Sequence, residues 1–190
     1  MDSQRGVAGR VITIFGSSRA QRGDVEYEAA KRLGALLAQR GWTVCNGGHE
    51  GTMEAAAWGA KEAGGQTIGV SIATYRPAVP NVWLDQDIVA ETLFARLERL
   101  VTFGDGFVVL RGGIGTLLEL ALVWNLGQIP QFAQKPIIVV GPEWEQVLTS
   151  IRSWLPMHPW EAARWRRAAG VDEAVTLLDA AFAPMSDLTR

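Results

Sequence analysis

Short apolar runs alternate with amphipathic stretches along this chain. Five runs rich in β-branched and other apolar residues predict β-strands. They span Val11–Phe15, Thr43–Cys45, Thr67–Ile72, Asp105–Leu110 and Pro136–Val140. Strands buried on both faces lose the alternation of polar and apolar positions, so these continuous runs predict a sheet covered on both sides.

Helical patterns fill the intervals between the predicted strands. Apolar residues recur at helical spacing from Ala30 to Leu37, which places them on one face of a helix. The predicted helices span 25–40, Thr52–Ala63, Glu91–Phe103, a very apolar stretch ending at Leu126, and a stretch from about Glu143. Residues 73–90 are interrupted by prolines and predict a long irregular connection. The chain after Trp154 predicts one or two terminal helices.

This alternation of strands and helices predicts the fold class. It is typical of an α/β protein, a Rossmann-like three-layer sandwich whose parallel sheet is flanked by helices. Three of the strands end in glycine-containing turns that open the next helix. Ligands bind such sheets at the carboxyl ends of the strands, so the three turns are expected at one edge.

The strongest local signal is the turn after the fourth strand, Arg111-Gly112-Gly113-Ile114-Gly115-Thr116. Gly112, Gly113 and Gly115 allow a ligand to approach the backbone closely, and the following helix offers free N–H groups and the positive end of its dipole. The turn therefore predicts a phosphate site, to which the Thr116 hydroxyl adds a donor. A purely structural tight turn is the alternative. The turn is neither a Walker loop nor a dinucleotide fingerprint.

Glu119 is the only charged residue between Arg111 and Lys135 and is surrounded by apolar neighbours. A carboxylate on a helix that is apolar on nearly all sides needs a ligand or a cation, because burying it alone is costly. The pattern thus predicts a functional carboxylate. The alternative is structural: Thr116 and Glu119 also fit a capping box at the start of the helix.

Arg96 is predicted to lie at the border of the apolar face formed by Leu93, Leu97 and Leu100. A guanidinium at the edge of a buried face usually pairs with a carboxylate or a phosphate. The alternative is an arginine whose stem covers apolar surface while its head reaches solvent.

The first two glycine turns complete the predicted site. Candidate nucleotide contacts are Gly16, Ser17 and Ser18 after the first strand, and Gly47, Gly48, Gly51 and Thr52 after the second. His49, in the second turn, is expected to be a surface residue. The two histidines are far apart in sequence and argue against a metal site.

Composition narrows the class of protein. The 190 residues carry a net charge of −2, which leaves no electrostatic footprint for nucleic acid. The single cysteine, Cys45, excludes an internal disulfide, and no stretch has the length of a membrane span. Residues 1–10 predict a disordered lead-in without a signal peptide, residues 11–190 a single domain, and the expected compartment is the cytoplasm.

With these motifs in place, the chain resembles the LOG-like family, named for the Lonely Guy cytokinin-activating enzymes. The resemblance covers Val11 to Trp144. The family box Pro-Gly-Gly-x-Gly-Thr-x-x-Glu is matched by Gly112, Gly113, Gly115, Thr116 and Glu119. The family's catalytic arginine is matched by Arg96, fifteen positions before Arg111. Arg111 stands where the family box begins with proline.

The resemblance implies hydrolysis of the N-glycosidic bond of a nucleoside 5′-monophosphate, giving free base and ribose 5-phosphate. It implies Arg96 and Glu119 as catalytic residues, no metal or cofactor, and a homodimer with the helix around Leu118–Trp124 near its interface. The alternative is a non-catalytic nucleotide- or cofactor-binding carrier, which Arg111 in place of proline favours.

Overall fold

The computed structural model describes residues 9–73 and 81–183. The strands among them are β1 Val11–Phe15, β2 Thr43–Asn46, β3 Thr67–Ile72, β4 Gln86–Ala90, β5 Gly106–Val109, β6 Ile137–Val140 and β7 Arg166–Ala168. The helices are α1 Val25–Ala38, α2 Thr52–Glu62, α3 Leu93–Phe103, α4 Ile114–Leu126, α5 Pro130–Ala133, α6 Pro142–Trp154, α7 Pro159–Ala162 and α8 Val171–Phe182.

The seven strands form one sheet in the order β4-β3-β2-β1-β5-β6-β7, and every neighbouring pair is parallel. The chain builds outward from β1 in one direction through β2 to β4, and then returns to add β5 on the other side. The order therefore reverses between β1 and β5. A crevice at the carboxyl ends of these two strands is the usual ligand site of such a sheet.

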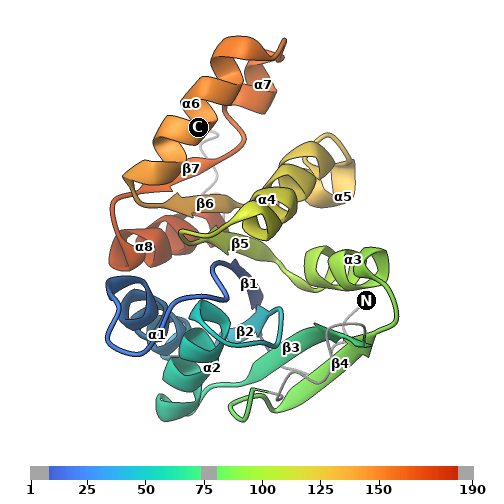
Figure 1. The fold of residues 1–190 in the computed structure, drawn as a ribbon. Coiled ribbons are helices and arrows are strands. Elements are labelled where there is room, and N and C mark those ends of the chain that lie inside the picture. The colour runs from blue at the N-terminus through green and yellow to red at the C-terminus, as the bar shows by residue number, and fades with distance from the viewer. Residues whose placement is uncertain (1–8, 74–80, 184–190) are drawn as a thin grey trace, which may run out of the picture.

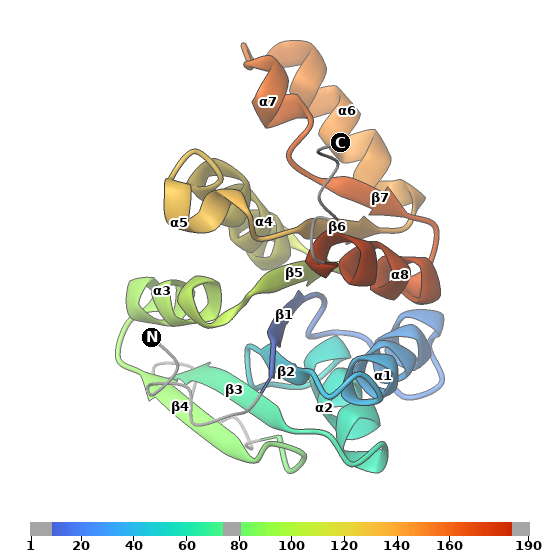
Figure 2. The same cartoon turned by 180° about the vertical axis from the view of Figure 1, so that it is seen from behind.

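Helices cover both faces of the sheet, as the sequence predicts for a three-layer Rossmann-like protein. In Figure 1, α1, α2 and α8 lie to the left of the sheet and α3 and α4 to the right; Figure 2 shows the same layers from behind. Two apolar clusters match these layers. One joins the sheet to α1, α2 and α8, and the other joins it to α3, α4 and α6.

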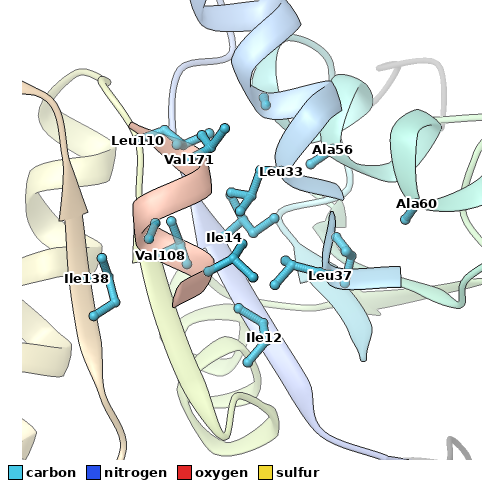
Figure 3. Packing of buried hydrophobic residues seen from close by; sticks show 14 of the residues in the cluster. Ile12, Ile14, Leu33, Leu37, Ala56, Ala60, Val108, Leu110, Ile138 and Val171 are labelled. Carbon is cyan, nitrogen blue, oxygen red and sulfur yellow. The ribbon is translucent and has the colours of Figure 1, made fainter. Parts of the chain in front are cut away.

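The strands beside the crevice are anchored by the first of these clusters. Ile12 and Ile14 of β1 lie beside Leu33 and Leu37 of α1, with Val108 of β5 next to them (Figure 3). All five side chains are at most 1% exposed. The apolar face predicted from Ala30 to Leu37 is thus the face that packs on the sheet, and it fixes the strand ends on which the loops of the site rest.

The structure corrects the number of strands. The five predicted strands are confirmed, but β4 lies within the stretch expected to be irregular, and β7 lies between α7 and α8, within the stretch expected to form only terminal helices. Both are edge strands, and their exposed residues include Gln86, Asp87, Arg166 and Arg167. Polar residues are common on sheet edges, where they discourage pairing with other chains. They also remove the continuous apolar run that identified the central strands.

Residues 1–8 of the predicted lead-in lie outside the described residues, as do 74–80 of the predicted connection. Arg10, at the end of that lead-in, contacts the body of the protein. Its carbonyl accepts a 2.8 Å hydrogen bond from the Thr43 amide, and its guanidinium lies 4.1 Å from the centre of the Phe182 ring.

Candidate functional site

A cleft of about 1280 Å³ lies at the carboxyl ends of β1, β2 and β5. It is bordered by the loops that follow these three strands and by α3 and α4. Ten predicted site residues line it: Gly16, Ser17, Ser18, Gly47, Arg96, Gly112, Gly113, Gly115, Thr116 and Glu119. The prediction that the three glycine turns meet at one edge of the sheet is confirmed.

One wall of the cleft is the start of α4. The helix begins at Ile114, and its N-cap residue, Gly113, has no side chain with which to cap it. The first four N–H groups of an α-helix have no partner within the helix, and here they belong to Gly113–Thr116. A Cβ atom built on Gly113 or Gly115 would meet nothing within 4 Å. The end of the helix therefore faces open space and suits an anion.

The Thr116 side chain joins two of the loops. Its hydroxyl donates a 3.0 Å hydrogen bond to the carbonyl of Gly16, and the side chain is buried. This bond fixes the loop after β1 on the first turn of α4. The expectation that this hydroxyl donates to a phosphate is therefore wrong, because its one proton is bound by the Gly16 carbonyl, and the donor left for a ligand is the Thr116 backbone N–H.

Glu119 and Arg96 form a buried ion pair in the lining of the cleft. Arg96 Nη1 donates to Glu119 Oε1 at 3.2 Å, and Arg96 Nε donates to the Val70 carbonyl at 2.9 Å. The two residues are 9% and 8% exposed. The predicted pairing of Arg96 with a carboxylate is confirmed, and a head group reaching into solvent is excluded.

Burial sets the pKa of the Glu119 carboxyl group. Removal from water raises the pKa of Glu119 to about 7, although the adjacent Arg96 guanidinium and its hydrogen bond act in the opposite direction. A carboxyl group with this pKa exchanges protons readily near neutral pH. It therefore has the property required of a general acid or base.

The capping-box alternative for Glu119 is wrong. Because α4 begins at Ile114 with Gly113 as its N-cap, Thr116 is the third residue of the helix and Glu119 the sixth. At that depth a side chain is beyond the free N–H groups of the first turn.

The lack of a side chain at Gly47 leaves the space that the Arg96 guanidinium occupies. A Cβ atom on Gly47 would lie 1.9 Å from Arg96 Nη2 and 2.7 Å from Met53 Sδ. Any larger residue would displace the guanidinium that holds Glu119. The absence of a side chain at position 47 is thus a condition for the buried pair.

Gly48, Gly51 and Thr52 lie behind the wall of the cleft. The Thr52 amide and hydroxyl both donate to the Ser17 carbonyl, at 2.9 and 3.1 Å. Gly51 has a φ of +73°, and a Cβ there would lie 2.2 Å from the same carbonyl. Gly48 donates its N–H to Asn46 Oδ1 at 2.8 Å. Gly51 and Thr52 therefore support the loop after β1, whereas Gly48 stabilises the turn after β2.

His49 lies in the wall of the cleft, whereas the sequence predicts a surface position. Its side chain is half-buried, and burial together with the nearby Arg96 lowers the pKa of the imidazole. A histidine in a loop carries no periodicity that could reveal its burial.

The remaining lining is largely apolar. Met53, Leu93, Leu97 and Leu117 contribute to it from α2, α3 and α4. In the sequence these residues are indistinguishable from core positions. An apolar surface beside a buried carboxyl group fits a flat organic ring better than a second charged group.

In the described part of the chain, no three histidine, cysteine, aspartate or glutamate residues are grouped to hold a metal ion. Nor is any helix within that part long and apolar enough to cross a membrane.

The family model of the SLOG cluster4 family matches residues 9–153, from the residues before β1 into α6. The chain belongs to the SLOG cluster4 family. The match includes all the loops that border the cleft and ends before β7 and α8. Arg111, which stands where the family box begins with proline, forms an ion pair with Glu26 of α1 at 2.7 Å.

Two enzymes of known name are similar in sequence to this SLOG cluster4 protein. A cytokinin riboside 5′-monophosphate phosphoribohydrolase of Mycobacterium tuberculosis is 39% identical over 131 residues, which cover 67% of this chain and 68% of that protein. A pyrimidine/purine nucleotide 5′-monophosphate nucleosidase of Escherichia coli is 33% identical over 132 residues, which cover 62% of this chain and 28% of that protein.

Solved structures resemble it over a greater length. The molybdenum cofactor carrier protein of Chlamydomonas reinhardtii has a TM-score of 0.72 and 27% identity, and the match covers 93% of this chain and 100% of the other. The molybdenum cofactor binding protein of Rippkaea orientalis has the same TM-score and identity, with 91% and 97% covered.

Proposed function

We propose that this SLOG cluster4 protein hydrolyses the N-glycosidic bond of a nucleoside 5′-monophosphate to free base and ribose 5-phosphate. The observation that carries the proposal is the placement of Glu119. It is a buried carboxyl group with a pKa of about 7, and it lies one turn beyond a helix N-terminus that faces the same cleft. The relatives named for this reaction support it.

The 5′-phosphate would bind the N–H groups of Gly113–Thr116. These amides and the helix dipole favour an anion, and Gly113 and Gly115 leave room for it. The ribose would then extend along α4 toward Glu119. The base would lie near the Gly16–Ser18 loop and the Gly47 turn, against the apolar lining.

The ionised Glu119 carboxylate would bind the ribose hydroxyls or take a proton from the attacking water. Water then adds its oxygen to the anomeric carbon as the bond to the base breaks. The departing base receives a proton, so that the products balance. Glycosidic cleavage develops positive charge on the sugar, which a nearby carboxylate stabilises. Arg96 would keep the carboxyl group oriented and favour its ionised form.

The test is chromatography of the products formed from AMP. The proposal predicts adenine and ribose 5-phosphate in equal amounts. Adenosine with inorganic phosphate would identify cleavage of the phosphate ester instead and would contradict it. Unchanged AMP in the presence of the folded protein would contradict it as well.

A second candidate is carriage of a nucleotide or another cofactor without turnover. The solved carrier structures favour it, because their match covers more of this chain than the match to the enzymes does. This function predicts that ligand raises the melting temperature while no product forms.

A homodimer in the cytoplasm is part of the same proposal. Three apolar side chains of the two helices that border the cleft are open to solvent: Phe94 of α3 at 84%, and Ile114 and Leu118 of α4 at 83% and 45%. Exposed apolar residues gathered beside a site are typical of a protein–protein interface.

A further inference from the structure

The proposed substrate places more negative charge in the cleft than α4 can balance. A phosphate monoester carries about −1.5 to −2 charges at neutral pH. A helix N-terminus supplies the equivalent of about +0.5 charge. Tight binding of the phosphate therefore calls for a cationic side chain in addition to the backbone amides.

Arg96 lines the cleft but does not supply this cation, because its guanidinium is already bound by other groups of the protein. Its guanidinium already contacts Glu119 and the Val70 carbonyl, and it lies beneath Gly47 with no space for a side chain between them. Turning it toward a phosphate would leave a buried carboxyl group without its partner, which is costly.

Arg19 is the other arginine among the described residues that line the cleft. It lies in the loop after β1, and its side chain is exposed. Within the described chain its guanidinium forms no ion pair. Five other exposed or partly exposed arginines each pair with a carboxylate: Arg22, Arg32, Arg40, Arg111 and Arg167. The exposed Arg99, Arg152 and Arg166 form no ion pair among the described residues either, but they do not line the cleft.

The backbone that carries Arg19 is fixed in place. The Arg19 N–H donates to Ser17 Oγ at 3.0 Å, and the Ser17 carbonyl accepts from Thr52. One residue earlier, the Gly16 carbonyl accepts from Thr116 on the first turn of α4. The loop thus holds Arg19 in a constant relation to the helix end where the phosphate is proposed to bind.

We propose that Arg19 binds the 5′-phosphate together with the amides of α4 and so makes the site specific for nucleotides over nucleosides. The inference rests on the proposed function. A guanidinium presents parallel N–H donors that match two phosphate oxygens, which a single amide cannot do. It would also neutralise the charge that the helix leaves uncompensated.

The experiment compares the wild type with Arg19→Ala and Arg19→Lys in AMP hydrolysis. Arg19→Ala is expected to raise the KM for AMP and the inhibition constant of inorganic phosphate about 10- to 100-fold, with kcat nearly unchanged. The inhibition constant of adenosine, which lacks the phosphate, is expected to stay the same. Arg19→Lys keeps the charge and is expected to fall between the two. Arg152→Ala, an exposed arginine of α6, serves as the matched control.

Equal KM values for AMP in the wild type and Arg19→Ala would overturn the inference, as would equal losses for phosphate and adenosine. Failure of the proposed function appears differently, in the wild type itself. If the wild type binds AMP without cleaving it, the comparison is made on dissociation constants from calorimetry, and an unchanged ratio of AMP to adenosine affinity overturns the role of Arg19. A wild type that does not bind AMP removes both proposals.

Discussion

The Glu119 carboxyl group is subject to two opposing influences. Burial favours its neutral form, and the Arg96 guanidinium at 3.2 Å favours its charged form. Because burial is the larger effect, the group titrates near pH 7 rather than at its ordinary value of 4.5. The fold is therefore less stable above neutral pH, and the Glu119 carboxyl group exchanges protons near pH 7.

This trade predicts a pH dependence of stability. A carboxyl group whose pKa is raised by folding stabilises the protein below the unfolded pKa, and that contribution is lost as the pH rises through the folded value. Glu119→Gln removes the titration. The free energy of unfolding of Glu119→Gln, relative to the wild type, should therefore increase by about 2–3 kcal/mol between pH 5 and pH 8. Urea unfolding at both pH values measures it; a difference that is flat with pH would contradict the account.

The sequence was sufficient to single out Glu119 and Arg96 because each is a charged residue in a markedly apolar pattern. His49, Met53 and Leu93 could not be found in this way. Their part in the cleft depends on which loops and helices the sheet brings together, and a core leucine has the same local pattern as a leucine that lines a cleft.

At the scale of elements, the site depends on where α4 begins. The turn before it and its glycines were predictable, because glycine after a strand and before a helix has few other uses. The exact N-cap was not, since Thr116 is also a favourable cap residue. The structure places the helix start three residues earlier, and this leaves the Thr116 hydroxyl to bond the neighbouring loop.

Two glycine substitutions should separate packing from ligand binding. Gly115→Ala adds a methyl group in open space within a helix, so stability should be unchanged or rise by about 0.5–1 kcal/mol, whereas AMP binding should weaken. Gly47→Ala would push a methyl group into Arg96 and should reduce both stability and activity.

Thermal unfolding and AMP calorimetry on both variants measure these effects. Unchanged AMP affinity in Gly115→Ala would argue against a phosphate at the start of α4. Wild-type activity in Gly47→Ala would show that Arg96 does not depend on the close approach of that glycine.

Across the whole molecule, the cleft is a consequence of strand order. β1 and β5 are adjacent although their first residues, Val11 and Gly106, lie 95 positions apart in the sequence. The sequence predicted a parallel sheet but contains no local signal for which strands are neighbours. It also missed β4 and β7, since the polar residues of edge strands conceal them.

The proposed dimer is a prediction at this same scale. Phe94→Glu places a charge at an exposed apolar position of α3, a helix that borders the cleft, and should shift the protein toward monomer in sedimentation experiments. Trp154→Glu on α6 is the matched control, because Trp154 is also 84% exposed and should leave the dimer intact. A wild type that sediments as a monomer at all concentrations would contradict the prediction.

The most direct test of the central claim is the turnover number of Glu119→Gln for AMP. The substitution keeps the shape of the side chain and removes its ability to ionise. We expect kcat to fall by at least about 100-fold, the usual contribution of a group that transfers a proton. Glu98→Gln, on the exposed side of α3, should keep the wild-type rate. A Glu119→Gln variant that cleaves AMP as fast as the wild type would contradict the account.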